Sequence, residues 1–379
     1  MSSAVTRRSF LRATAAVPLL ARDWRSGPPA SYVKELERLM RAAPVPGAVI
    51  GGVREHEPGW ILPLGVQLEG SDSAVTASTL FQAASLTKQA TAYAAFALRD
   101  AGKLDFERPL TEYLDDLPDP AARRVRIRHV LSHSSGFPNW RSPTDENPAP
   151  ALTPSFEPGE RYRYSGEGYF YLQRILEAVT GQGFVGLMRE LVFEPLSMTS
   201  STVLWDPATL DRTARPHGSH GEVGKGWDAA ARAVRAYADR IGRAPDELRY
   251  DDYAAAIREA GKPGLPNWIV PNAAASLVTT AEDYARFVAA ATRRTEIVRQ
   301  QVEINEFLGW GLGWAIERAD GRVYAWQWGD NPGFKNFVLA EPADGAAVFV
   351  FTNGDSGARV YDRALTHATG HDHPALFWL

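Results

Sequence analysis

Cysteine is absent from this 379-residue sequence, which excludes disulfide bonds, thiolate metal sites and a cysteine nucleophile. Long apolar runs are also missing, and no stretch approaches the roughly 20 residues that a membrane-spanning helix needs. Basic residues are not in excess, because 41 lysines and arginines stand against 45 aspartates and glutamates, a net charge of -4. The composition therefore shows no basic surface of the kind that binds nucleic acid. The hydrophobic content of 45% is ordinary for a globular protein, and the chain is long enough to bury a sizeable core.

The N-terminus pairs a basic segment, residues 6–12 (TRRSFLR), with a short apolar one, residues 13–21 (ATAAVPLLA). This order is typical of an export signal, and the paired arginines resemble a twin-arginine signal. We expect residues 1–22 to be that signal and the mature protein to work in the periplasm or outside the cell. A plain basic arm is the alternative, because the apolar region is short and no clear Ala-x-Ala cleavage site follows it.

A serine stands three residues before a lysine at two places, Ser31 with Lys34 and Ser85 with Lys88. Residues three apart share one face of a helix, so a lysine there can lie beside the serine hydroxyl and activate it. Ser31 opens a charged, amphipathic segment and is expected to be an N-cap.

The second pair, Ser85 and Lys88, has a different context. The helix that begins near Ser85 is almost uncharged over residues 89–98, so we expect it to be buried nearly all round. An unpaired buried charge is costly, which favours a functional role for Lys88. The alternative is that Lys88 extends to the surface.

The pattern along the chain predicts a mixed α/β fold of the α+β type, with an antiparallel sheet flanked by helices and a mainly helical insertion. We expect one domain over residues 23–379, with sheet parts at about 30–100 and 271–379 and a helical part at about 101–270. The expected strands are residues 46–53, 60–66, 309–318, 322–328, 336–340 and 346–352. The main expected helices are residues 32–40, 85–101, 169–181, 228–241, 251–260 and 356–368.

Several segments, taken together and in order, resemble the serine β-lactamase and penicillin-recognising superfamily, which includes class C β-lactamases, DD-peptidases and esterase relatives. The resemblance covers most of the chain, from about residue 32 to residue 353. Several motifs in the family's order identify the family far more specifically than the Ser-x-x-Lys tetrapeptide alone. The matching segments are residues 85–88 (SLTK), the nucleophile motif; 127–136 (IRHVLSHSSG), similar to the family's HLLSHTSG; 164–166 (YSG), at the place of Tyr-x-Asn; and 327–329 (QWG), at the place of Lys-Thr-Gly or His-x-Gly.

The resemblance implies a β-lactamase/transpeptidase-like fold and an acyl-enzyme formed on Ser85. It implies that Tyr164 takes the serine proton, and that Lys88 holds both in a hydrogen-bond network where its cation lowers the pKa of Tyr164. The oxyanion hole would use the backbone N–H groups of Ser85 and Asp330. The implied substrate-binding positions are Gly166, Gln327, Trp328 and Gly329. No cofactor and no metal are implied, and the expected partner is a small-molecule acyl substrate.

Three departures from the family pattern bear on the substrate. Gly166 stands where the family often has asparagine, and Gln327 stands where lysine or histidine is usual. A neutral amide binds a substrate carboxylate poorly, and Trp328 in place of a small residue makes the acyl pocket more apolar. The sequence therefore favours an esterase acting on small esters or amides. A β-lactamase or D-amino-acid peptidase is the alternative enzyme, and a catalytically impaired ligand-binding homologue is the alternative of another class.

Histidines offer the other candidate chemistry. His129 and His133 are four residues apart, a spacing that suits a metal on a helix, but no third ligand accompanies them. His367, His371 and His373 are expected to belong to a solvated tail. Gly-x-Ser-x-Gly is absent, which argues against an α/β-hydrolase.

Overall fold

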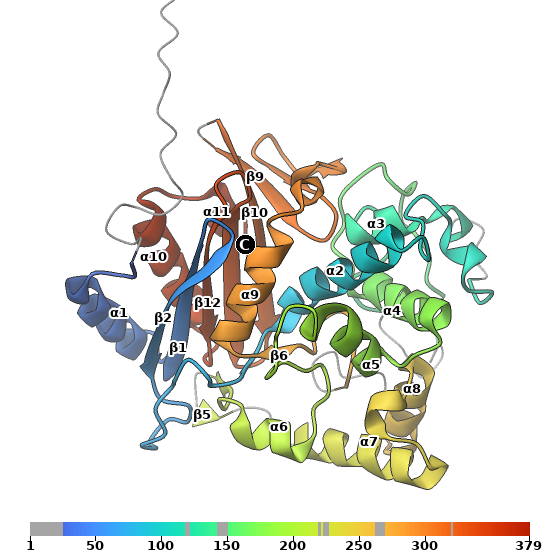
Figure 1. Ribbon diagram of the computed structural model, residues 1–379, viewed down its shortest axis with the longest axis horizontal. Helices are drawn as coiled ribbons and strands as arrows, with labels where there is room; N and C mark the ends of the chain where they lie inside the picture. The colour runs from blue at the N-terminus through green and yellow to red at the C-terminus, as the bar shows by residue number, and fades with distance from the viewer. Residues whose placement is uncertain are drawn as a thin grey trace, which may run out of the picture.

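The computed structural model describes residues 26–117, 122–141, 151–218, 221–222, 227–261, 270–319 and 321–379. Its centre is an eight-stranded antiparallel sheet in the order β2-β1-β12-β11-β10-β9-β8-β7 (Figure 1). The expected fold class is confirmed, whereas the expected export signal at residues 1–22 lies outside the described residues. The strands of this sheet are β1 (Gly47–Arg54), β2 (Glu57–Gly65), β7 (Val302–Glu303), β8 (Leu308–Trp310), β9 (Ala315–Ala319), β10 (Arg322–Asn331), β11 (Phe334–Glu341) and β12 (Ala346–Thr352).

The sheet joins segments that are far apart in the sequence, because β1 pairs with β12 from Ala48 opposite Thr352 to Val53 opposite Ala347. A helical part is inserted between β2 and β7, and Figure 1 shows it beside the sheet. The helices are α1 (Ala30–Ala42), α2 (Thr87–Asp100), α3 (Ile127–Leu131), α4 (Gly166–Thr180), α5 (Phe184–Met188), α6 (Pro207–Arg212), α7 (Trp227–Ile241), α8 (Tyr250–Glu259), α9 (Ala281–Ala291), α10 (Gly357–Thr369) and α11 (Pro374–Trp378).

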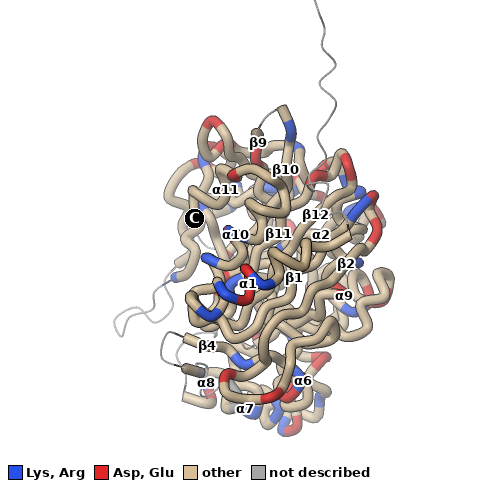
Figure 2. Tube along the Cα trace, turned by 90° about the vertical axis from the view of Figure 1, so that its left-hand side faces the viewer, with Lys and Arg blue, Asp and Glu red and all other residues tan. Residues whose placement is uncertain are grey.

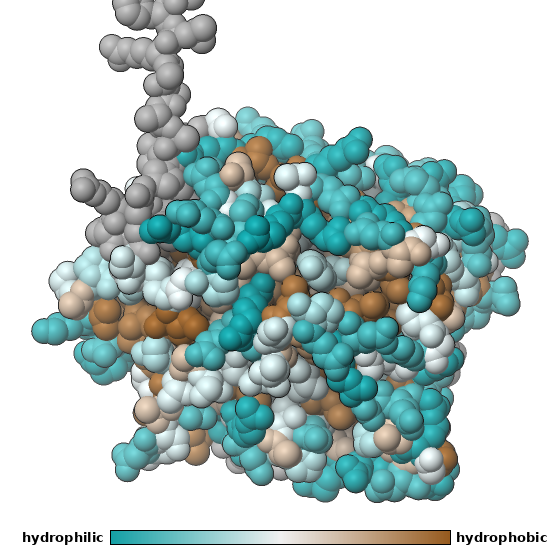
Figure 3. Space-filling model, viewed as in Figure 1, coloured by the Kyte–Doolittle hydropathy of each residue, from teal (hydrophilic) through white to brown (hydrophobic). Residues whose placement is uncertain are grey.

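Each face of the sheet has its own buried cluster, as the alternation of side chains along a strand requires. On β12, Val348 and Val350 belong to the cluster that contains residues of α1 and α10. Phe349 and Phe351 point to the other face, where Tyr284 of α9 packs edge-on against both rings. The space-filling view in Figure 3 shows hydrophilic side chains over much of the α9 side, with apolar ones in a band across its middle.

Charges of both signs are interspersed along the chain, as the side view in Figure 2 shows. Within the ranges given above, no helix combines the length and the apolar character needed to cross a bilayer. Helix α1 begins at Ala30 and has Pro29 as its N-cap, so the expectation that Ser31 caps this helix was wrong by two positions.

One expected strand, residues 309–318, is instead two strands, β8 and β9, separated by a turn. Gly313 in this turn has φ of +81°, which side chains other than glycine rarely adopt. A Cβ at Gly313 would lie 2.3 Å from the Cβ of Ala92 in α2. The turn therefore allows the sheet to approach the buried helix α2, which the sequence pattern did not indicate.

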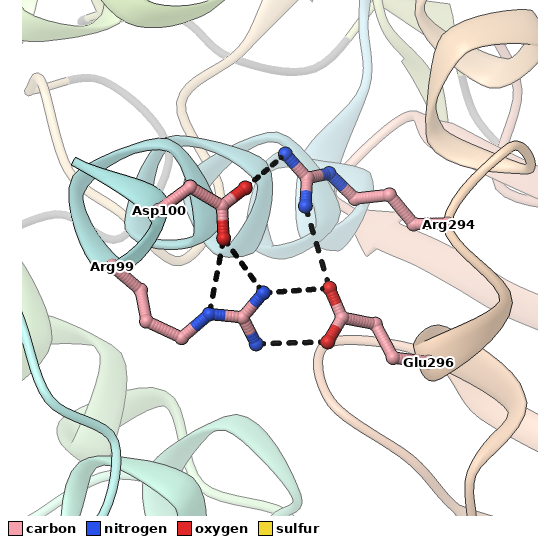
Figure 4. A network of polar contacts seen from close by, with 4 residues as sticks. All are labelled: Arg99, Asp100, Arg294 and Glu296. Atoms are coloured by element: carbon pink, nitrogen blue, oxygen red, sulfur yellow. Dashed lines mark hydrogen bonds and ion pairs between the residues drawn. The ribbon is translucent and has the colours of Figure 1, made fainter. Parts of the chain in front are cut away.

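The C-terminal end of α2 is held by a network of four charged side chains, shown in Figure 4. Arg99 binds both carboxylate oxygens of Glu296 at 2.8 Å, and Arg294 binds Asp100 at 2.8 Å. Hydrogen bonding to Arg99 lowers the pKa of Glu296. These side chains are partly exposed, so solvent screens the network and its contribution to stability is small.

Candidate active site

Ser85 lies in a one-turn 3-10 helix, Ala84–Leu86, that leads directly into α2. Ala84, immediately before the serine, has φ of +52°, a conformation that is strained for an alanine and that is found most often at functional sites. Ala84 and Leu86 are buried, whereas Ser85 is partly exposed. The turn therefore presents the serine hydroxyl at the N-terminal end of α2, where the helix dipole favours developing negative charge.

Lys88 is only 1% exposed, so the alternative that it reaches the surface was wrong. Its ammonium or amine nitrogen, Nζ, donates to Ser85 Oγ at 3.1 Å and to the carbonyl oxygen of Ala274 at 2.8 Å. Nζ also lies 4.9 Å from the centre of the Tyr164 ring. Burial lowers the pKa of Lys88 from 10.5 to about 7, because the charged form loses its hydration. A lysine with such a pKa can accept the serine proton near neutral pH.

Tyr164 completes the group around the serine. Its hydroxyl is hydrogen-bonded to the Ser85 side chain and accepts a hydrogen bond from Gln327 Nε2 at 3.3 Å. Burial raises the pKa of Tyr164 well above 10, against the smaller lowering effects of these two hydrogen bonds. The pKa of Tyr164 is therefore raised, whereas the sequence analysis expected Lys88 to lower it, because desolvation of the phenolate is the largest effect. Tyr164 is a neutral phenol in this site.

The His133 ring packs against the Tyr164 ring, a contact that the sequence did not predict. The two rings stack at 4.2 Å between centres, and Trp310 meets the histidine ring edge-on at 4.7 Å. His133 Nδ1 accepts a hydrogen bond from the backbone N–H of Ser165 at 3.0 Å. Burial, and next the charge of Lys88, hold the pKa of His133 well below 6.5, so the ring is neutral. Only its place in the 127–136 segment could have drawn attention to it.

The two histidines of this segment do not converge. His129 Nδ1 accepts a hydrogen bond from the backbone N–H of Arg126 at 3.2 Å, away from His133. Among the described residues, no group of three or more histidine, cysteine, aspartate or glutamate side chains is arranged to hold a metal ion. The expectation of a solvated tail is wrong for His373, which is fully buried against Glu317 of β9 at 2.7 Å.

The third motif lies on β10, next to the serine. Gln327 is fully buried, and its Nε2 atom lies 3.5 Å from the Ser85 carbonyl oxygen. Gln327 contacts Tyr164 and the Ser85 backbone, and its expected role in binding substrate stays a prediction. Trp328, on the opposite face of the strand, is partly exposed and packs 4.8 Å from the Tyr164 ring. The third motif thus places the buried amide of Gln327 next to the Ser85 backbone and the indole of Trp328 against the Tyr164 ring.

Gly329 is where β10 comes closest to the serine turn. A Cβ at this position would lie 2.4 Å from the carbonyl oxygen of Ala83 and 3.3 Å from the Cβ of Ala84. Both distances are shorter than ordinary van der Waals contacts, so a larger residue would force the strand and the turn apart. Glycine is therefore required here for the close approach of β10 to Ser85.

The pairing of β10 shows to which side the backbone N–H of Asp330 points. Strands β10 and β11 are joined by a two-residue turn, with Asn331 opposite Phe334 as the closing pair. In such a hairpin the closing pair is hydrogen-bonded, so the N–H of the next residue, Asp330, points away from β11. Residues 327–331 of β10 pair with β11 on one side only, and β9 does not extend along their other side. The Asp330 N–H thus points to the unpaired edge of β10, and its role as an oxyanion donor stays a prediction.

Gly166 is the first residue of α4, and its surroundings explain the missing asparagine side chain. A Cβ at Gly166 would lie 2.1 Å from the Trp140 ring, so the indole occupies the space of a side chain. The Gly166 N–H donates to Asn139 Oδ1 at 2.9 Å. The structure thus covers this predicted substrate-binding position with Trp140, which the sequence analysis did not identify.

Comparison with known proteins agrees with this geometry. The family model named Beta-lactamase matches residues 34–371. Penicillin-binding protein 4 of Amycolatopsis lactamdurans is 28% identical over 354 residues, which cover 86% of this chain and 85% of that protein. Lovastatin esterase of Penicillium rubens is 34% identical over 113 residues, which cover 24% of this chain and 28% of that protein.

A solved structure shares the fold. The crystal structure of Beta-Lactamase/D-Alanine Carboxypeptidase from Pseudomonas syringae aligns with a TM-score of 0.67 at 16% identity, over 89% of this chain and 98% of that one. The family match spans most of the chain, and it includes the serine turn, the Tyr164 segment and the open edge of β10. The protein is therefore a member of the beta-lactamase family.

Proposed function

We propose that this protein is a serine hydrolase that forms an acyl-enzyme on Ser85 and acts on small esters or amides. The observation that carries the proposal is the placement of a buried lysine nitrogen 3.1 Å from a partly exposed serine hydroxyl. A buried lysine with a pKa of about 7 is the kind of base that can activate a serine. The family resemblance to both a penicillin-binding protein and an esterase supports acyl transfer as the reaction class.

The proposed reaction begins with neutral Lys88 taking the Ser85 proton while Oγ attacks the substrate carbonyl carbon. The backbone N–H groups of Ser85 and Asp330 stabilise the oxyanion, where one such donor contributes about 3 kcal/mol. Tyr164 donates its proton to the leaving oxygen or nitrogen as the bond to carbon breaks, and it is reprotonated by Lys88. Water then attacks the acyl-enzyme and gives one proton to Lys88. Lys88 returns this proton to the Ser85 oxygen as the bond to the acyl carbon breaks, which restores the serine hydroxyl and neutral Lys88.

The proposed preference for esters without a carboxylate follows from the neutral and apolar side chains near Ser85. The position that commonly carries a cation in the family holds the buried neutral Gln327. Lys335, opposite Asp330 on β11, is paired with Asp330 at 2.8 Å and with Asp355 at 2.9 Å, so its charge is already neutralised. Trp328 adds an apolar wall beside Tyr164. A substrate carboxylate finds little attraction in such a site.

β-Lactamase or D-amino-acid peptidase activity is the alternative, favoured by the similarity to penicillin-binding protein 4 over most of the chain. Hydrolysis of a chromogenic cephalosporin as fast as that of simple esters would support it and contradict the ester preference. A ligand-binding homologue without turnover is the alternative of another class.

The test of the proposal is labelling with a fluorophosphonate, which reacts with activated serines. We expect intact-mass spectrometry to show one adduct on the wild-type protein, peptide mapping to place it on Ser85, and Ser85→Ala to abolish it. Ser31→Ala, at the other serine that precedes a lysine, is the matched control and should label normally. A folded wild-type protein that takes up no label and hydrolyses no ester would instead be a binding protein.

The rate should also depend on pH through Lys88. Its pKa is lowered to about 7, and only its neutral form can accept the serine proton, so activity falls as the pH drops through about 7. We expect kcat/KM for a neutral ester to decrease by about tenfold per pH unit below that point and to level off above it. Burial lowers the pKa of His133 well below 6.5, so this ring titrates at lower pH than Lys88. A flat profile between about pH 5.5 and 8.5 would contradict Lys88 as the base.

A further inference from the structure

Helix α11 brings an aromatic side chain to the edge of the site. The ring of Trp378 packs edge-on against Trp328 at 5.9 Å, against Trp326 at 6.0 Å and against Tyr162 at 5.9 Å. Trp328 in turn lies 4.8 Å from Tyr164. Trp378 remains 36% exposed and Trp328 is also partly exposed, so Trp328 presents apolar surface beside Tyr164 and Trp378 presents it beside Trp328.

The position of α11 is fixed by buried polar contacts with the sheet. Glu317 of β9 is fully buried and accepts hydrogen bonds from the backbone N–H of Ala375 at 3.0 Å and from His373 Nδ1 at 2.7 Å. His373 Nε2 lies 3.0 Å from Thr369 Oγ1 at the end of α10. Removing one partner of such a buried group is costly, so this contact holds the helix in one place. Figure 1 shows α11 close to β9 and β10.

The role of Tyr164 in the proposed reaction indicates which part of a substrate lies next to Trp328 and Trp378. Tyr164 donates its proton to the leaving oxygen, so the alcohol part of an ester lies next to Tyr164 when the bond breaks. Trp328 flanks Tyr164, and Trp378 extends the same apolar surface outward from Trp328. In that arrangement the alcohol group would extend along the two indoles, while the acyl group stays bound to Ser85.

We propose that Trp378 of α11 forms the outer wall of the alcohol-side pocket and makes the protein selective for esters of bulky, apolar alcohols. The proposal rests on the hydrolase function proposed above and names the substrate class of that same site. Large aromatic side chains such as tryptophan bind apolar groups through their area and their ring faces. Because Glu317 and His373 fix α11, this wall is preformed, so little ordering is needed when the substrate binds.

Acetate esters that differ only in the alcohol test the proposal. All of them leave the same acetyl group on Ser85, so deacylation is identical and differences in kcat/KM arise on the alcohol side. We expect the wild-type protein to prefer 2-naphthylmethyl acetate over ethyl acetate by kcat/KM. We expect Trp378→Ala to reduce that preference by about tenfold, the usual effect of losing one apolar contact in a pocket, and Trp378→Phe to restore part of it.

The matched control is Phe377→Ala, in the same helix, because Phe377 is 79% exposed and its loss should leave the preference unchanged. Thermal melting of each variant shows that the fold is intact. A Trp378→Ala protein that is folded, hydrolyses ethyl acetate and keeps the full preference would overturn this proposal alone. A wild-type protein that hydrolyses neither ester and takes up no fluorophosphonate would overturn the hydrolase function and this proposal with it.

Discussion

Replacing Lys88 with methionine is expected to lower kcat/KM for ester hydrolysis by about 10³-fold or more, because the site loses its base. Methionine has nearly the length of lysine and no charge, and position 88 is 1% exposed, so the apolar side chain suits its surroundings. The substitution leaves the carbonyl oxygen of Ala274 without the Lys88 hydrogen bond, at a cost of about 1–3 kcal/mol, while it removes the cost of burying an amine. The two effects oppose each other, so the variant should remain folded.

The measurement is kcat/KM with a simple nitrophenyl ester, together with the thermal melting temperature. Lys34→Met is the matched control, since Lys34 also follows a serine by three residues but is exposed on α1. It should leave activity unchanged. If Lys88→Met keeps more than about a tenth of the wild-type activity, proton transfer to Lys88 is not what activates Ser85.

Replacing Gly329 with alanine is expected to reduce kcat by about 10²-fold or more and to destabilise the fold by about 1–3 kcal/mol. The added Cβ would lie 2.4 Å from the carbonyl oxygen of Ala83, a backbone atom that cannot rotate away. The strand and the serine turn must therefore separate. That movement draws the N–H of Asp330 away from the N–H of Ser85, and an oxyanion hole depends on both donors reaching the same oxygen.

Steady-state kinetics and thermal melting check this expectation. Gly186→Ala, in α5, serves as the control, because the atom nearest to its added Cβ is the side-chain oxygen of Gln182 at 3.7 Å, an ordinary van der Waals contact. That variant should be as active and as stable as the wild type. A Gly329→Ala variant with nearly normal kcat would mean that the two N–H groups are not brought together by this close approach.

Local patterns in the sequence predicted much of the fold. The uncharged run after Lys88 predicted a helix buried nearly all round, and α2 is mostly buried. Apolar runs bounded by turn residues predicted β1, β2, β10, β11 and β12, because period-two alternation and glycine turns are properties of a few adjacent residues. The split between β8 and β9 was missed, since it depends on the approach of Gly313 to Ala92, more than two hundred residues earlier in the chain.

The sequence by itself determined which chemical groups are present: no thiol, a serine three residues before a lysine in an apolar helix, and a neutral Gln327 in the third motif. Only the tertiary structure decided how those groups behave. The pKa of Lys88 falls, and that of Tyr164 rises, because distant segments exclude water from both. The covering of Gly166 by Trp140 and the contact of Trp378 with Trp328 likewise join residues far apart in sequence. Burial and long-range contact depend on the whole chain, and a local pattern of residues does not contain them.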